Sequence, residues 1–183
     1  MISENNAPLG AFVKFVSRYK SYIFCFIIFI IFNCTFKSIK IVGESMEPTL
    51  LDGDRAIALL NGFIKYEPKV NDIVVFKSEE YSNHYLVKRV IGVPGDSISI
   101  IDNKLYVNEN LVTENYILEP MITEDCSYEV GNDEIFVLGD NRNNSADSRI
   151  PSIGLVNYKE EVLGKLLVDL SNLLRKWFVK EIN

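Results

Sequence analysis

Hydrophobic positions form one unbroken run near the start of the chain and shorter, alternating stretches after it. Residues 22–32 contain no charge, and extended through 33–36 the run measures ~22 Å as a helix, against a bilayer core of roughly 30 Å. Flanking lysines that reach the headgroups can offset this shortfall, so the run predicts a membrane-spanning helix over 21–36. A cleaved leader fits residues 33–36 poorly, and a buried core helix would need a polar face that the run lacks.

The remainder of the chain has the pattern of a mostly β domain. Residues 72–77 and 84–93 are rich in β-branched and aromatic side chains, and 97–108 alternates about an Asp102-Asn103 turn, which predicts a hairpin. Residues 134–138 predict another buried strand. Short strands of this kind indicate a barrel or sandwich. The apolar residues of 158–182 recur at helical spacing and predict a helix that packs on the domain or lies at the membrane interface.

Length and charge narrow the classes of protein. The 183 residues carry a net charge of −6, divided as +2 on residues 1–36 and −8 on the rest. Residues 37–183 suit one domain, and their acidity makes nucleic acid an unexpected partner. Two of the three cysteines lie in the apolar run, so no disulfide framework is predicted. No Cys/His spacing indicates a metal site, and we expect neither metal nor cofactor.

Ser45 is the first candidate for chemistry. Gly43 permits an unusual backbone conformation and Pro48 restricts the residue before it, so Ser45 lies in a constrained turn. Most serines in such turns are ordinary turn residues. A serine becomes a nucleophile only when a base removes its proton and nearby donors stabilise the oxyanion.

Two residues of the predicted strand at 84–93 compete for the role of base. His84, the single histidine, and Lys88 would lie about 13 Å apart on one face, so both cannot serve Ser45. The neighbours of Lys88 at 86, 87, 90 and 91 are apolar, and loss of hydration lowers a lysine pKa from ~10.4 towards the range where a neutral amine accepts a proton. This favours Lys88 and leaves His84 as a strand-edge residue.

Four segments resemble, in order, the motifs of the type I signal peptidases, membrane-bound Ser/Lys endopeptidases that remove signal peptides from exported preproteins. The segments are 45–50 (SMEPTL), 72–76 (DIVVF), 88–96 (KRVIGVPGD) and 139–149 (GDNRNNSADSR). The resemblance covers the apolar run and nearly all of the following domain, in the compact form of Gram-positive-type bacteria. It implies a mostly β fold: a signal-peptidase-like β-barrel or sandwich catalytic domain with one N-terminal transmembrane helix.

The resemblance also implies roles for individual residues. Ser45 would be the nucleophile and Lys88 the general base, in a variant of the triad logic. Ser145 would hydrogen-bond the Lys88 amine and orient it. Asp147 would pair with Arg149 to fix the loop, a structural role rather than that of a catalytic acid.

Two positions depart from the family pattern. Asn71 stands where glycine is frequent, and asparagine tolerates the left-handed conformation. Gly43 stands where some members have a hydroxyl donor, so the oxyanion hole would depend on backbone amides, including that of Ser45. Substrates would be signal peptides with small residues at the first and third positions before the cut, presented by extended pairing to a strand edge. The apolar candidates for the pockets are Ile41, Met46 and Val87.

Orientation in the membrane follows from the resemblance more than from charge. The basic residues on the two sides nearly balance under the positive-inside rule: Lys14, Arg18 and Lys20 before the run, and Lys37, Lys40 and Arg55 after it. We expect a cytoplasmic segment at 1–20, an anchor at 21–36 and an extracytoplasmic catalytic domain at 37–183. The expected partners are signal peptides and the lipid bilayer.

Three other functions remain open at this stage. One is a membrane-tethered binding module of unrelated function, which would leave the four motifs unexplained. A self-cleaving repressor-like peptidase uses Ser/Lys chemistry on a related β scaffold, but such proteins are soluble and the apolar run argues against one. A catalytically silent paralogue that only binds signal sequences is the non-enzyme alternative, against which the intact Ser45, Lys88 and Ser145 argue.

Overall fold

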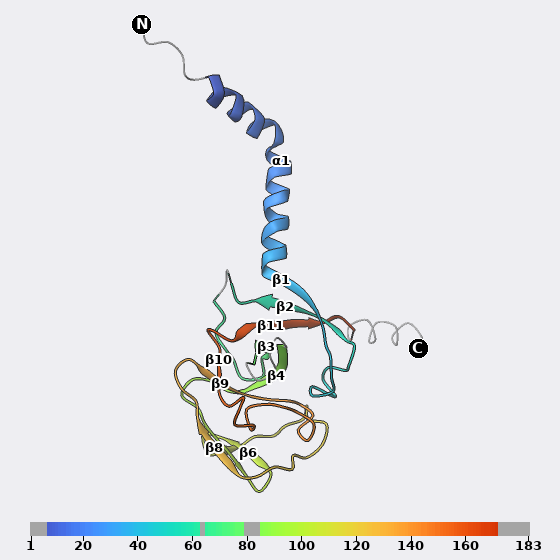
Figure 1. Cartoon of the computed structure of the whole chain (residues 1–183), viewed down its shortest axis with the longest axis vertical. Coiled ribbons are helices and arrows are strands. Elements are labelled where there is room, and N and C mark those ends of the chain that lie inside the picture. The colour runs from blue at the N-terminus through green and yellow to red at the C-terminus, as the bar shows by residue number, and fades with distance from the viewer. Residues whose placement is uncertain (1–6, 63–64, 79–84, 172–183) are drawn as a thin grey trace, which may run out of the picture. The chain divides into compact units, whose positions relative to one another are not determined.

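The computed structural model describes residues 7–62, 65–78 and 85–171 of the 183. They fall into two compact units, residues 1–35 and residues 36–183. Figure 1 traces the helix of the first unit and the strands of the second. His84, the alternative base, lies outside the described residues, as do residues 172–182 of the predicted C-terminal helix.

The first unit is the helix α1 (Ala7–Thr35). Its segment Ser17–Thr35 is long and apolar enough, by length and composition, to cross a membrane. These 19 residues rise about 28 Å, which removes most of the shortfall expected from the sequence. Asn33 and Thr35 are accommodated because their side chains bond the carbonyls one turn back, Phe29 O at 2.8 Å and Ile31 O at 2.7 Å.

The second unit consists of antiparallel strands in two sheets. The strands are β1 (Phe36–Lys40), β2 (Arg55–Leu60), β3 (Ile73–Lys77), β4 (Tyr85–Gly92), β5 (Ser97–Ile101), β6 (Lys104–Val107), β7 (Asn110–Leu111), β8 (Cys126–Glu129), β9 (Glu134–Leu138), β10 (Val156–Asn157) and β11 (Val162–Asp169). Seven form one sheet in the order β1-β2-β11-β3-β4-β9-β10, and four form the other in the order β7-β6-β5-β8. The predicted mostly β fold is confirmed.

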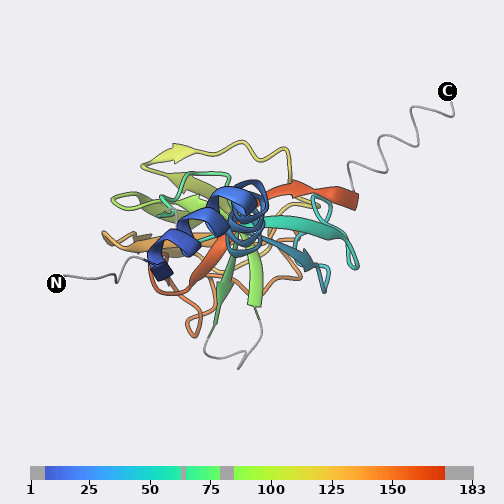
Figure 2. The same cartoon turned by 90° about the horizontal axis from the view of Figure 1, so that it is seen from above.

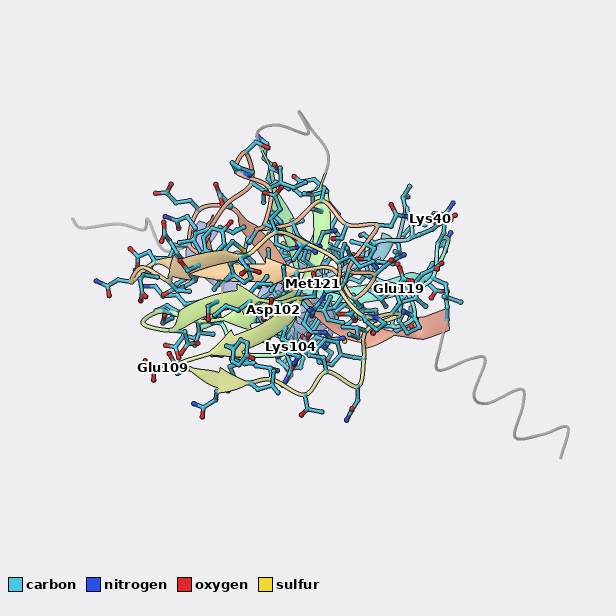
Figure 3. The ribbon with its side chains drawn as sticks, turned by 90° about the horizontal axis from the view of Figure 1, so that it is seen from below. Lys40, Asp102, Lys104, Glu109, Glu119 and Met121 are labelled. Atoms are coloured by element: carbon cyan, nitrogen blue, oxygen red, sulfur yellow. The ribbon has the colours of Figure 1, made fainter. Side chains whose placement is uncertain are left out.

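Five of the eleven strands of the described residues lie where the sequence predicts them. β3, β4 and β9 occupy the three predicted segments, and β5 and β6 form the predicted hairpin. Figure 3 shows Asp102 and Lys104 at its turn, where Asp102 and Asn103 have φ of 51° and 61°. Asn71 has a φ of 73°, so asparagine does adopt the left-handed conformation expected there.

Two element boundaries differ from the prediction. Phe36, expected at the end of the anchor, begins β1 and pairs with Leu59 of β2. The predicted helix at 158–182 is wrong over Val162–Asp169, which is β11. This strand lies between β2 and β3, and β2 and β11 run side by side in both views (Figures 1 and 2). Register shifts between Val162 and Gly164 and between Leu166 and Val168 interrupt the alternation of a regular strand, so its apolar residues mimic helical spacing.

Three clusters of buried apolar residues fill the second unit. One joins β5 and β6 of the smaller sheet to β9 of the larger, through residues such as Ile98, Leu105 and Phe136. Another lies among β3, β4, β9, β10 and β11. The third, built on Ile41, Met46, Leu50 and Ala56, packs beneath the turn that carries Ser45.

Candidate active site

Ser45 and Lys88 meet although 43 positions separate them in the chain. Lys88 Nζ donates a hydrogen bond to Ser45 Oγ at 2.7 Å and another to Val87 O at 3.0 Å. Lys88 extends from β4, whereas Ser45 lies in the turn after β1. A nucleophile and a base in hydrogen-bond contact form the central arrangement of covalent catalysis.

Burial sets the protonation of the Lys88 amine. The residue is 1% exposed. Loss of hydration lowers its pKa to about 8, against a weaker opposing effect from the negative charges of Asp147 and Asp140. A lysine with this pKa is partly neutral near physiological pH and can then accept a proton.

Backbone contacts hold the turn that carries Ser45. Gly43 has a φ of 94°, a left-handed conformation that favours glycine, and its N–H donates to Asp52 Oδ1 at 2.8 Å. From the opposite side, Asn141 donates its backbone N–H to Ser45 O at 3.1 Å and its side-chain amide to Glu44 O at 3.2 Å. Within the described residues, no hydrogen bond has the Ser45 N–H as donor. This amide is therefore free to serve an oxyanion.

Gly139 lets the fourth motif approach the nucleophile closely. A Cβ built on Gly139 would collide with the Ser145 side chain and lie 2.5 Å from Ser45 O. Real Cβ atoms essentially never approach another heavy atom so closely. Glycine is therefore required by packing at this position.

We expect Gly139→Ala to lower kcat/KM for the reaction at Ser45 at least about tenfold and to destabilise the fold by roughly 1–3 kcal/mol, because the added methyl displaces Ser45 or Ser145. Activity assays and thermal unfolding would measure both effects. Gly62→Ala is the matched control, since a Cβ there meets nothing within 4 Å. Equal behaviour of the two variants would contradict this account of the packing.

Ser145 lies beside the nucleophile turn but makes no hydrogen bond with Lys88. Its Oγ is buried without a hydrogen-bond partner among the described residues. The Lys88 amine instead bonds Ser45 and Val87 O. The expected Lys88–Ser145 hydrogen bond is therefore absent from this structure, and the orienting role of Ser145 stays a prediction.

The predicted ion pair of Asp147 with Arg149 is present. Arg149 donates to both carboxylate oxygens of Asp147, at 2.8 and 2.9 Å, and also to Arg142 O at 2.6 Å. The fully buried Asp147 accepts the Gly139 N–H at 3.0 Å. This pair therefore connects the two ends of the fourth motif and holds Gly139 in place.

A second network of buried ion pairs supports the site. These pairs were not predicted from the sequence. Arg89 donates to both oxygens of Asp140, at 2.8 and 2.6 Å, and its guanidinium lies 4.1 Å from the centre of the Tyr116 ring. Arg142 makes a similar two-bond pair with Glu114, at 2.7 and 2.5 Å. The available signal was the presence of Arg89 next to Lys88 and of Asp140 in the fourth motif. Asp140 is thus a structural partner of Arg89.

A cavity of about 610 Å³ opens at Ser45 and Lys88. All three predicted pocket residues, Ile41, Met46 and Val87, line it. β1 is an end strand of its sheet, and β4 pairs with β9 only from Arg89 onward. Residues 37–42 and 85–88 therefore present two strand edges to the cavity, suited to an extended peptide.

The described residues contain no group of three or more His, Cys, Asp or Glu side chains that could hold a metal ion.

Comparison with known protein families matches residues 15–170 to the family described as "Signal peptidase, peptidase S26". The chain is 39% identical over 148 residues to a signal peptidase I P of Bacillus subtilis subsp. natto, covering 74% of this chain and 78% of that protein. It is 38% identical over 140 residues to a signal peptidase I of Bacillus amyloliquefaciens, covering 70% of this chain and 72% of that protein.

The comparisons also match one plant protein and one solved structure over a smaller part of this chain. A chloroplastic thylakoidal processing peptidase 1 of Arabidopsis thaliana is 40% identical over 119 residues, 60% of this chain and 35% of that longer protein. A crystal structure of a signal peptidase I from Enterococcus faecalis aligns with a TM-score of 0.48 and 31% identity, over 56% of this chain and 98% of that one.

Proposed function

This chain belongs to the signal peptidase family, peptidase S26, a family of membrane serine endopeptidases that cleave signal peptides, and on that premise we propose that Ser45 is its nucleophile and Lys88 its general base. The observation that carries the proposal is the 2.7 Å contact between Lys88 Nζ and Ser45 Oγ, with the amine buried. Neutral Lys88 accepts the Ser45 proton as Oγ attacks the scissile carbonyl carbon.

The remaining steps use the same two side chains. The Lys88 ammonium donates its new proton to the departing amine of the mature protein, leaving the signal peptide esterified to Ser45. A water molecule then attacks the ester carbonyl while Lys88 takes its proton, and Ser45 is regenerated. In both steps the Ser45 N–H stabilises the negative charge on the carbonyl oxygen. A backbone donor is needed here because Gly43 has no hydroxyl group to donate.

Substrate selection follows from the cavity along the two strand edges. An extended segment pairing with residues 37–42 and 85–88 directs alternate side chains to one wall, which brings the first and third residues before the cut to the same side. Ile41, Met46 and Val87 narrow that wall, so small residues fit best. Ser145 orients the Lys88 amine once a substrate has excluded water.

A series of preproteins that differ only at the residue before the cut tests this function. We expect alanine to be cleaved at least about a hundredfold faster than leucine, because the apolar wall cannot accommodate the larger side chain. Purified full chain in detergent would be assayed by the shift in preprotein mass. A Ser45→Ala variant gives the background, and equal cleavage of both substrates would contradict the assignment of the pocket.

The alternatives gain no support from these observations. The matched family and relatives are signal or processing peptidases, with no repressor among those described above. Contact between Ser45 and Lys88 argues against a catalytically silent paralogue.

We further propose that residues 1–20 are cytoplasmic, that residues 21–36 anchor the chain in the membrane, and that the catalytic domain at 37–183 is extracytoplasmic. The apolar segment Ser17–Thr35 supports the span, and a family that processes exported proteins supports the orientation. Protease added outside intact spheroplasts should degrade an epitope fused after residue 183 and spare one fused before residue 1. The reverse pattern would contradict this topology.

A further inference from the structure

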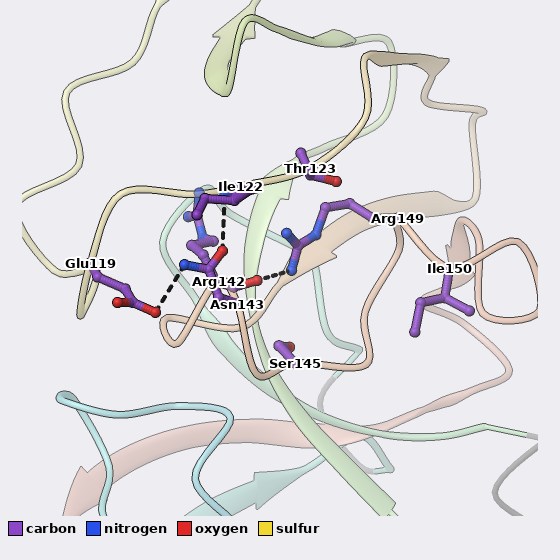
Figure 4. Close-up of a pocket in the computed structure, with 8 residues that line it drawn as sticks. All are labelled: Glu119, Ile122, Thr123, Arg142, Asn143, Ser145, Arg149 and Ile150. Atoms are coloured by element: carbon purple, nitrogen blue, oxygen red, sulfur yellow. Dashed lines mark hydrogen bonds between the residues drawn. The ribbon is translucent and has the colours of Figure 1, made fainter.

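A second cavity, of about 560 Å³, lies between the fourth motif and the segment 119–123 (Figure 4). Ile122 and Ile150 line it, with 78% and 36% of their surfaces exposed. The cavity also includes Ser145, whose buried Oγ has no partner among the described residues. None of the roles proposed above uses this cavity.

Asn143 fixes the wall of this cavity. Its side-chain amide donates to Glu119 Oε1 at 2.9 Å and to Pro120 O at 3.0 Å, and its Oδ1 accepts the Ile122 N–H at 2.8 Å. Figure 4 shows Asn143 between Glu119 and Ile122. These three bonds hold the segment 119–122 against the fourth motif, so the exposed Ile122 side chain belongs to a formed surface.

The cavity adjoins the nucleophile. Ser145 is one of its lining residues, and Gly139 packs closely against both the Ser145 side chain and Ser45 O. The Asn141 N–H bonds the same Ser45 carbonyl. Ser145 therefore borders both this cavity and the turn that presents the nucleophile.

The two positive charges that line the cavity are paired with carboxylates, whereas its negative charge has no ion-pair partner among the described residues. Arg142 and Arg149 line it, but each pairs with a carboxylate, Glu114 and Asp147 respectively. Glu119 is exposed and takes part in none of the ion pairs of the described residues. The cavity thus offers two exposed isoleucines and one uncompensated negative charge on an otherwise polar lining, which suits apolar or basic side chains better than acidic ones.

We propose that this cavity binds the first residues of the mature protein, those that follow the cut. The inference rests on the proposed function, which places the residues before the cut along β1 and β4. The chain beyond the scissile bond must then leave Ser45, and this cavity lies near the same turn, because Gly139 packs against both Ser45 O and the cavity residue Ser145. Four extended residues cover roughly 13 Å, so the second to fourth residues after the cut would contact Ile122 and Ile150.

Two substrates that are identical before the cut test the proposal. The short one ends one residue after the cut, and the long one continues to four residues, with leucine as the second to fourth. With the full chain in detergent, we expect kcat/KM for the long substrate to exceed that for the short one about tenfold, mainly through a lower KM. Ile122→Asp should reduce this ratio by roughly threefold to tenfold.

Leu111→Asp is the matched control, since Leu111 is 58% exposed and does not line the cavity. Aspartate in place of the leucines should lower kcat/KM in the wild type, and by less in Glu119→Gln. A wild-type ratio near one, or equal effects of Ile122→Asp and Leu111→Asp, would overturn the inference. Failure of the wild type to cleave either substrate would instead overturn the proposed function, and this inference with it.

Discussion

Replacing Lys88 with methionine is expected to reduce kcat for signal-peptide cleavage by about 10⁴-fold or more. The amine of Lys88 contacts Ser45 Oγ at 2.7 Å, and within the described residues no other basic side chain hydrogen-bonds that oxygen. Methionine has a similar length and is apolar, so it fills the same space without accepting a proton. Single-turnover cleavage of a preprotein measures the loss, with Ser45→Ala as a second inactive variant.

The matched control is Lys159→Met, at an exposed lysine paired with Asp133, which should retain activity. Lys88→Arg should also be inactive, because a guanidinium stays protonated and cannot act as a base. Cleavage by Lys88→Met within tenfold of the wild type would exclude Lys88 as the base.

Measuring the thermal unfolding of Lys88→Met shows whether the variant is inactive because it lacks the base or because it fails to fold. In the wild type, the Lys88 pKa falls from its ordinary 10.5 to about 8 on burial. Below pH 8, burying the protonated Lys88 amine therefore reduces the free energy of unfolding by about 3 kcal/mol. Methionine has no such cost, so we expect the variant to be at least as stable as the wild type at neutral pH, even though it is inactive.

The sequence predicts the reactive pair and the Asp147–Arg149 ion pair, but not the second network of buried ion pairs around them. Ser45 and Lys88 are recognisable because constrained turns and apolar flanks leave a local pattern, and the motif order then relates them. The Arg89–Asp140 and Arg142–Glu114 pairs leave no such pattern. The first joins β4 to the fourth motif, and the second joins the segment after β7 to the same motif, so both contacts depend on the tertiary fold.

The wrong helix prediction over β11 and the absence of the Lys88–Ser145 hydrogen bond have a similar origin. β11 is flanked by strands on both sides and interrupted by two register shifts, so its sequence lacks the alternation of a half-buried strand. The position of Ser145 depends on Gly139, whose missing side chain allows a close approach that no periodicity reveals. Motif order locates such residues in the chain, whereas packing decides which atoms they contact.

The pH dependence of cleavage should follow the protonation of Lys88. Only the neutral amine accepts the Ser45 proton, and its pKa is about 8 in the free enzyme. As pH falls below this value the neutral fraction declines tenfold per unit, so kcat/KM should rise about fiftyfold between pH 6 and pH 8 and level off above pH 9.

Bound substrate should shift this profile in a defined direction. An extended peptide that covers the cavity excludes water from Lys88 and further disfavours the ammonium, so the midpoint for kcat should lie at lower pH than that for kcat/KM. Initial rates from pH 5.5 to 10, on a substrate without titratable groups near the cut, would give both profiles. A kcat/KM that is constant from pH 6 to pH 8 would be incompatible with Lys88 as the base, because proton transfer from Ser45 requires the deprotonated amine.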